Sequence, residues 1–200
     1  MNYRNGCALR FDLHTHPLEG SCITKPSQIT RDSIGRIVKM MKKRGLDGIA
    51  ITEHNDFSLG CEAAKYAEDF GVIILPGEEI DWGNHHILRI SAFGKDYYIL
   101  AHPRTPFEYT NQVKLDAVEF GSNRGKFPLA YQIAEERNIP LVQNSDAHLL
   151  CDLGLHTSFV DLEAYLRGEF RLIDVRELTK YHHCSIDSLY SNIYATQLGH

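Results

Sequence analysis

Short apolar segments of the chain alternate with longer segments that have helical periodicity. Apolar residues alternate with polar ones over residues 8–13, which is typical of a half-buried strand. Apolar residues at helical spacing predict a helix over residues 26–44, with Gly45 as its stop signal. Further strands are predicted at residues 47–52, 72–75, 86–93, 97–101, 117–120, 140–143 and 157–160, and further helices at residues 58–70, 127–137, 162–167 and 186–198.

Strands that alternate with helices form parallel sheets with right-handed crossovers, and the functional side chains of such folds follow the carboxyl ends of the strands. Histidines and carboxylates follow five of the predicted strands: His14 and His16, Glu53 and His54, Glu78 and Glu79, His102, and Asp146 and His148. Five such placements favour a closed or nearly closed α/β barrel with these side chains at its mouth. The length of 200 residues fits a single domain, with a C-terminal helical tail at about residues 180–200.

The pair His14 and His16 is the first indication of a metal site. Side chains two positions apart on an extended segment point the same way, so the two imidazoles can bind one ion. Other candidate residues have a plainer explanation when each is taken alone. His54 could be a core histidine, Asp146 a helix N-cap, His102 part of a turn before Pro103, and Glu78 and Glu79 a solvated pair. All of these explanations would have to hold together, which favours a shared metal site.

The candidate ligands are imidazoles and carboxylates, which suit zinc, iron(II) or manganese. They outnumber the three or four protein ligands that a zinc ion usually takes. Two or three divalent ions are therefore predicted, with at least one carboxylate bridging between them. Paired ions can clamp the attacking and leaving oxygens of a phosphoryl transfer and give hydroxide at neutral pH, so the set predicts a hydrolytic enzyme.

Composition narrows the class of protein further. The formal charge of −5 argues against general nucleic-acid binding through a basic face. The five cysteines are scattered and form no C-x-x-C, which argues against a zinc knuckle and predicts reduced thiols in a cytoplasmic protein. No apolar run has the length of a membrane span and no signal peptide opens the chain, so no membrane contact is predicted. His182, His183 and His200 are expected at the surface of the tail.

Six motifs follow one another along the chain. They are D-L-H-T-H at residues 12–16, I-T-E-H-N at 51–55, P-G-E-E-I at 76–80, H-I-L at 86–88, A-H-P at 101–103 and S-D-A-H at 145–148. This ordered set covers residues 9–160 and resembles the PHP (polymerase and histidinol phosphatase) family of metal-dependent phosphoesterases. The resemblance implies a distorted TIM-like (β/α)7 barrel with two or three metal ions at its mouth.

The resemblance also implies roles for individual residues. His14, His16, Glu79 and Asp146 would bind one ion and form the catalytic set, Glu79 would bridge to a second ion bound by His86 and His102, and His54 and His148 would bind a third. Glu79 is preferred to Glu78 because the acid of the family motif directly precedes the apolar residue, here Ile80.

Two stretches depart from the family pattern. Thr52-Glu53-His54 stands where the family usually has T-D-H, and no S-D-G follows the H-x-H pair. Glu19-Gly20 is the candidate replacement for S-D-G in a shortened loop, so Glu19 joins the candidate metal ligands. The alternative is a weak third metal site.

The sequence thus predicts a metal-dependent phosphoesterase that hydrolyses a small phosphorylated metabolite or nucleotide through a metal-bound hydroxide. Arg104 follows His102 and is a candidate for binding the phosphate, with a solvated surface arginine as the alternative.

A PHP-type nuclease is another interpretation of the sequence, although the acidic charge weighs against it. An amidohydrolase-type enzyme would normally show a metal-ligating lysine or a different order of histidines. A non-catalytic binding or scaffold module is a further alternative, and the absence of tightly bound metal from purified protein would favour it.

Overall fold

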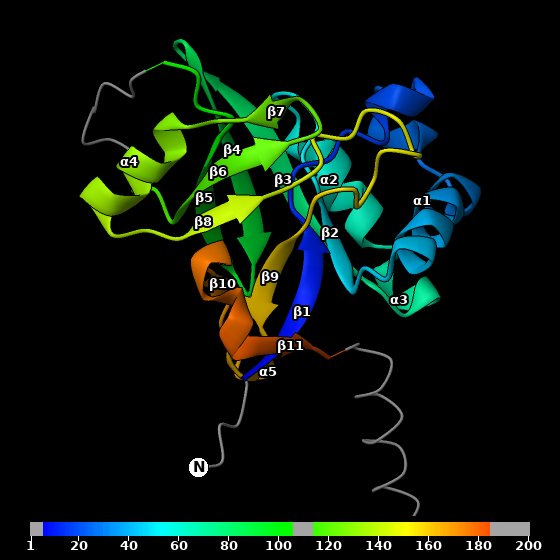
Figure 1. Ribbon diagram of the computed structural model, residues 1–200. Coiled ribbons are helices and arrows are strands. Elements are labelled where there is room, and N and C mark those ends of the chain that lie inside the picture. The colour runs from blue at the N-terminus through cyan, green and yellow to red at the C-terminus, as the bar shows by residue number, and fades with distance from the viewer. Residues whose placement is uncertain (1–5, 106–113, 185–200) are drawn as a thin grey trace, which may run out of the picture.

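The computed structural model describes residues 6–105 and 114–184, which form a curled sheet flanked by helices (Figure 1). Its eleven strands pair in the order β10-β9-β1-β2-β3-β4-β5-β6-β7, with β11 beside β1 and β8 beside β6. The strands are β1 (Gly6–Asp12), β2 (Gly48–Ile51), β3 (Ile73–Trp82), β4 (His85–Ala92), β5 (Lys95–Ala101), β6 (Ala117–Ser122), β7 (Gly125–Lys126), β8 (Leu141–Gln143), β9 (Ser158–Asp161), β10 (Leu172–Ile173) and β11 (Tyr181–His183).

The sheet is mixed, whereas the sequence predicts a parallel one. β1, β2 and β3 pair in parallel, and so do β5, β6 and β8. β3, β4 and β5 form antiparallel pairs instead. The reason is local: Phe93-Gly94 joins β4 to β5 with both residues in the left-handed region (φ 52° and 73°), the geometry of a tight hairpin without a crossover helix. The expectation of a parallel (β/α)7 barrel is therefore wrong for this part of the sheet.

The sheet curls into a half-barrel, and the segments that follow β1 and β8 meet at one end of it. The amide of Asp146 donates to the carbonyl of His14 (2.9 Å), and the amide of His16 donates to the carbonyl of Ala147 (2.8 Å). Side chains from opposite strands pack together inside the curl, among them Leu9, Phe11, Leu13, Leu88, Ile90, Ile99 and Val142.

Helices pack against the sheet. They are α1 (Arg31–Arg44), α2 (Phe57–Ala64), α3 (Ala67–Phe70), α4 (Leu129–Arg137) and α5 (Leu162–Leu166), with short 3-10 helices η1 (Glu19–Ser21), η2 (Pro26–Gln28) and η3 (Val175–Lys180). α1, α2 and α3 lie beside β1–β3, and α4 lies beside β6 and β8 (Figure 1). α1 begins later than predicted because Thr30 caps it by accepting a hydrogen bond from the amide of Ser33 (3.2 Å). The helix predicted over residues 58–70 is divided into α2 and α3.

The last described strand, β11, pairs in parallel with the start of β1. This pairing joins Cys7 and Cys184 in a disulfide across 177 positions of sequence, so the expectation of reduced thiols is wrong for these two residues. The spacing of cysteines along the chain could not indicate this bond, because a disulfide requires proximity in space. Cys22, Cys61 and Cys151 are free.

His182 and His183, expected in the tail, are exposed residues of β11. The helix predicted over residues 186–198, and His200, lie outside the described residues. Within the described part of the chain, no helix combines the length and the apolar character that crossing a lipid bilayer requires.

Candidate metal centre

The chain leaves β1 as a buried extended segment, and its two histidines form the floor of the candidate metal centre. His14 and His16 are fully buried. Asp12 is also fully buried, and it accepts hydrogen bonds from the amides of Ser145 (3.0 Å) and Gly154 (2.8 Å). Burial raises the pKa of Asp12 to about 6. This carboxyl group holds the segment after β8, which carries Asp146 and His148, against the end of β1.

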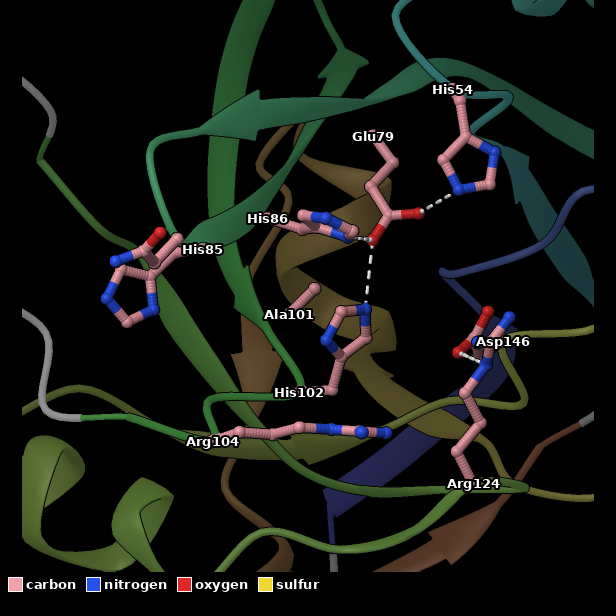
Figure 2. A pocket seen from close by; sticks show the side chains of 10 residues that line it. His54, Glu79, His85, His86, Ala101, His102, Arg104, Arg124 and Asp146 are labelled. Carbon is pink, nitrogen blue, oxygen red and sulfur yellow. Dashed lines mark hydrogen bonds and ion pairs between the residues drawn. The ribbon is translucent and has the colours of Figure 1, made fainter.

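Glu79 lies at the centre of the cluster and is 1% exposed (Figure 2). Its Oε1 lies 2.7 Å from Nδ1 of His86 and 3.0 Å from Nε2 of His102. Its Oε2 lies 3.3, 3.2 and 3.1 Å from Nε2 of His14, His16 and His54, respectively. The two oxygens of one carboxylate therefore face two different sets of histidines.

The environment of Glu79 favours its ionised form. Burial alone would raise the pKa, but the charge of His14 and the polar contacts with His102, His14 and His16 outweigh this effect and hold the pKa of Glu79 below its usual range. The residue lies inside β3, so the expectation that Glu78 and Glu79 follow a strand is wrong. β3 is longer than predicted because its second half pairs with β4.

Glu78 points to the opposite face of β3 from Glu79, as alternation along a strand requires. Its Oε1 accepts a hydrogen bond from Nη1 of Arg89 (3.1 Å). The side chain of Glu78 thus belongs to an ion pair outside the cluster, while that of Glu79 lies within it.

The histidine nitrogens at the floor are free to bind a metal ion. Within the described residues, Nε2 of His14 and both ring nitrogens of His16 are buried and form no hydrogen bond. Burial lowers the pKa of His16 to about 3, which favours the neutral imidazole and its lone pair. Nε2 of each histidine lies 3.7 Å from Oδ1 of Asp146. Buried nitrogens without a hydrogen-bond partner are costly, and a divalent ion would satisfy these.

The described residues contain several groups whose possible ligand atoms all lie within 4.8 Å of one another. Four of these groups meet at this end of the sheet: His14 with His16 and Glu79; Glu79 with His86 and His102; His14 with His102 and Asp146; and His16 with Glu19, His54 and His148. All nine predicted ligands occur in these groups. Their donor set of imidazoles and carboxylates fits zinc, iron(II) or manganese. The role of each residue as a ligand stays a prediction.

The two departures from the family pattern are linked in space. Glu53 is fully buried and accepts hydrogen bonds from the amides of Leu18 (2.8 Å) and Glu19 (3.3 Å). Glu19 in turn accepts a hydrogen bond from the amide of His54 (3.0 Å) and lies 2.9 Å from its Nδ1. Glutamate is one methylene longer than the usual aspartate, so Glu53 can reach and fix the shortened loop that presents Glu19 to His54.

Gly20 allows this loop to approach the segment that carries His148. A Cβ atom at residue 20 would lie 1.6 Å from the carbonyl oxygen of His148. Only glycine tolerates such a close approach of two backbones. The close approach of the two backbones explains why a glycine follows Glu19. The same approach places Glu19 and His148 in one group of possible metal ligands.

Two of the predicted ligands have a backbone conformation that is unfavourable outside glycine. The φ angles of His102 and Asp146 are 29° and 55°. Such conformations cost about 1–3 kcal/mol and are found most often at functional sites. Hydrogen bonds hold both residues in place: the amide of His102 donates to Glu119 (3.1 Å), and the amide of Asp146 donates to His14 (2.9 Å).

Sequence reasoning missed Glu119, which is fully buried in β6. Its Oε1 lies 3.3 Å from Nδ1 of His14 and accepts a hydrogen bond from Nδ2 of Asn144 (3.1 Å). A carboxylate behind a metal-binding histidine fixes the orientation of the ring and raises its basicity. The available signal was one charged residue within an otherwise apolar strand. Glu119 is therefore a positioning residue for the ring of His14 and, because its carboxylate accepts a hydrogen bond from the backbone amide of His102, for His102.

We expect Glu119→Gln to weaken metal binding and to lower kcat/KM by roughly 10–100-fold, because the amide keeps the shape but removes the charge behind His14. Metal titration and steady-state kinetics measure the two effects. Glu136→Gln, at an exposed position of α4, is the control and should change neither. Wild-type metal affinity in Glu119→Gln would contradict the positioning role.

The cluster opens into a pocket of about 270 Å³, which Arg104 and Arg124 line on the side of Asp146 (Figure 2). Arg124 was also missed, because it lies in the turn between β6 and β7 without a motif around it. Its Nε forms an ion pair with Asp146, and its Nη2 lies 3.4 Å from Nδ1 of His148. The guanidinium carbon of Arg104 lies 6.0 Å from the centre of the Phe127 ring. An anion in this pocket would meet two cationic side chains.

Comparisons with known proteins agree with this architecture. Residues 128–166 match the family model described as PHP-associated. An uncharacterized protein of Methanocaldococcus jannaschii is 35% identical over 82 residues, 36% of this chain and 44% of that protein, so the aligned part spans less than half of this relative.

Solved structures share the fold at low sequence identity. A two-domain protein of Bacteroides vulgatus that contains a predicted PHP-like metal-dependent phosphoesterase superposes with a TM-score of 0.58 at 15% identity, over 86% of this chain and 66% of that one. An amidohydrolase of Chromobacterium violaceum, solved with bound sulfate and no metal, superposes with a TM-score of 0.50 at 14% identity, over 74% of this chain and 90% of that one.

The fold defines a PHP-like α/β protein with a candidate metal centre at the end of its curled sheet. The family match and the structural matches confirm the resemblance to the PHP family that the ordered motifs indicate. The matched residues 128–166 include Asp146 and His148, so the family match reaches the candidate centre itself.

Proposed function

We propose that this protein is a metal-dependent phosphoesterase that hydrolyses a small phosphorylated metabolite or nucleotide. The observation that carries the proposal is the position of Glu79. Its Oε1 faces His86 and His102, whereas its Oε2 faces His14 and His16. A carboxylate shared in this way can bind two cations at once, and paired cations are suited to phosphoryl displacement.

Different residues of the chain would have different roles in such a reaction. Two or three zinc, manganese or iron(II) ions would supply Lewis-acid stabilisation of charge and activation of water. Glu79 and Asp146 would balance the charge of the ions, and His14 and His16 would fix their position from the floor. Arg104 and Arg124 line the same pocket and would orient the phosphate through charge-assisted hydrogen bonds.

Two other enzyme classes are distinguished by the substrates they would accept. An amidohydrolase is favoured by the structural match to the enzyme of Chromobacterium violaceum. However, none of the described residues that line the pocket is a lysine, and the sulfate bound in that enzyme is a tetrahedral dianion like a phosphate. A PHP-type nuclease would need a path for a polynucleotide backbone, and the net charge of −5 weighs against it.

A panel of substrates tests the proposal. Purified protein is assayed with phosphomonoesters, phosphodiesters, a single-stranded oligonucleotide and cyclic amides, each with manganese, zinc or iron(II). We expect metal-dependent release of phosphate from at least one small phosphorylated compound. Hydrolysis confined to amides would identify an amidohydrolase, and hydrolysis confined to the oligonucleotide would identify a nuclease. Either result would overturn the proposal.

We expect protein that was never exposed to chelator to carry two or more transition-metal ions per chain, because the ligand groups around Glu79 outnumber those that one ion needs. Elemental analysis by mass spectrometry measures the stoichiometry. Protein dialysed against a chelator and then reloaded is the control, and it should recover the same content. A stoichiometry near zero, with no uptake on reloading, would support the non-catalytic module.

A further inference from the structure

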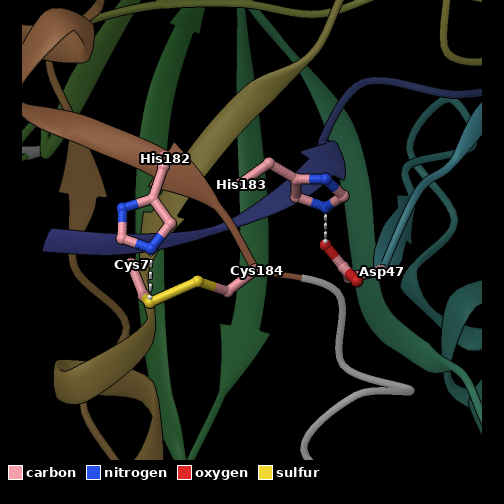
Figure 3. The surroundings of a disulfide bond; sticks show 5 residues. All are labelled: Cys7, Asp47, His182, His183 and Cys184. Atoms are coloured by element: carbon pink, nitrogen blue, oxygen red, sulfur yellow. Dashed lines mark hydrogen bonds and ion pairs between the residues drawn. A yellow bond between two sulfur atoms is a disulfide. The ribbon is translucent and has the colours of Figure 1, made fainter. Parts of the chain in front are cut away.

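A second cluster of metal-binding side chains lies at the other end of β1. Cys7, His182 and Cys184 offer ligand atoms within 4.8 Å of one another (Figure 3). Cys7 and Cys184 form the disulfide, and Sγ of Cys7 also lies 3.3 Å from Nε2 of His182. A disulfide needs no histidine, so the third member of the cluster calls for a separate explanation.

The pairing of β11 with β1 places these three side chains on one face. Cys7 is in register with His182, and the amide of Cys184 donates to the carbonyl of Ala8 (3.0 Å). Residues two apart on a strand point the same way, so His182 and Cys184 project together toward Cys7. His183 projects to the opposite face, where its Nε2 lies 2.9 Å from Oδ2 of Asp47 (Figure 3).

We propose that Cys7, Cys184 and His182 form a metal site for zinc when the two cysteines are reduced, separate from the centre around Glu79. On one tetrahedral ion, two thiolate sulfurs lie about 3.8 Å apart and each lies about 3.6 Å from an imidazole nitrogen, when Zn–S is about 2.3 Å and Zn–N about 2.0–2.1 Å. The contact of 3.3 Å between Cys7 and His182 is close to this separation. Once the S–S bond is broken, rotation of the Cys7 and Cys184 side chains can move their two sulfur atoms apart to the distance that a zinc ion requires.

The donor atoms decide which metal this site prefers. Thiolate and imidazole together select zinc over the hard cations magnesium and calcium. The residues that line the pocket at Glu79 include no cysteine. His182 is exposed, so an ion can reach the cluster from solvent. A fourth coordination position would remain for water.

The disulfide and the metal exclude each other because both use the same two sulfur atoms. A dithiol reductant breaks the S–S bond by giving two electrons and two protons, and it becomes a cyclic disulfide itself. The two thiols of Cys7 and Cys184 then each release a proton as they bind the divalent ion. In either state β11 stays fastened to β1, so the two ends of the described chain are held together.

Cobalt(II) is the probe for this site, because thiolate ligation of cobalt gives a charge-transfer band in the near ultraviolet that imidazole and carboxylate ligands do not give. Full-length protein is reduced, freed of reductant without air, and titrated with cobalt. We expect the band in reduced protein and no band in the disulfide form. Cys7→Ser and Cys184→Ser should each lose most of the band. The readout does not require hydrolysis, so it is independent of the proposed function.

Matched variants separate this cluster from other ligands. His182→Asn should bind cobalt at the thiolate site more weakly by more than about 10-fold, the smallest loss expected even for a residue that only orients a ligand. His183→Asn, one residue away on the opposite face, should retain wild-type binding. A triple variant that replaces Cys22, Cys61 and Cys151 with serine should keep the band, because these cysteines lie outside the cluster.

Alkylation of the reduced wild-type protein keeps the proposal testable even where a cysteine variant fails to fold. Zinc should protect Cys7 and Cys184 from iodoacetamide, while the exposed Cys22 and Cys151 react, and peptide mass spectrometry reports each site. Equal reaction of all cysteines with and without zinc, or a cobalt band that survives in both Cys7→Ser and Cys184→Ser, would overturn the proposal.

Discussion

Glu79→Gln is expected to lower kcat/KM by more than about 100-fold and to reduce the metal content of the protein. Removing a residue that only orients a metal ligand already costs about 10–100-fold, and Glu79 contacts two sets of histidines directly. Glutamine keeps the shape of the side chain but replaces one oxygen with an NH₂ group, which cannot bind a cation. The substitution also removes a buried negative charge that lies between both sets of histidines.

Glu78→Gln is the matched control for this experiment. Its side chain pairs with Arg89 on the opposite face of β3, and partly exposed ion pairs of this kind contribute about 0–1 kcal/mol. Metal content and turnover should stay near those of the wild-type protein. Both variants are compared by elemental analysis and steady-state kinetics with the substrate that the panel identifies. An inactive Glu78→Gln beside an active Glu79→Gln would show that the assignment is wrong by one residue.

His14→Ala and Asp146→Ala are expected to damage turnover to a similar extent, and the double variant should be hardly worse than either. Both side chains face the same position, since Nε2 of His14 lies 3.7 Å from Oδ1 of Asp146. Residues that act as one unit give strongly non-additive effects when they are removed together. Kinetics at saturating manganese measure these effects, with thermal unfolding as the control for folding. Near-wild-type turnover in folded His14→Ala would end the phosphoesterase proposal.

His148→Ala should behave differently from these two variants. His148 belongs to the group with His16, Glu19 and His54, and it also contacts Arg124. We expect it to raise KM more than it lowers kcat, because it lies beside a candidate phosphate-binding arginine rather than at the floor. A loss of kcat as large as that of His14→Ala would show that the third group is required for the chemical step.

The sequence by itself determined which side chains form the candidate centre. The motifs are local, and they place His14, His16, Asp146 and His148 just after strands, where neighbouring strand ends meet at one end of the sheet. The choice of Glu79 over Glu78 also rested on a local feature, the position of the acid directly before the apolar residue Ile80 in the family motif. All nine predicted ligands occur in the groups at this end of the sheet, although Glu79 and His86 lie within strands rather than after them.

The tertiary structure alone decided how the strands pair and what supports the ligands. The antiparallel pairing of β3, β4 and β5 depends on two tight turns, which the periodicity of the strands does not reveal. Glu119 reaches His14 across 105 positions of sequence, and Cys7 reaches Cys184 across 177. No local pattern encodes contacts over such separations, because they exist only after the sheet has curled and has brought distant strands side by side.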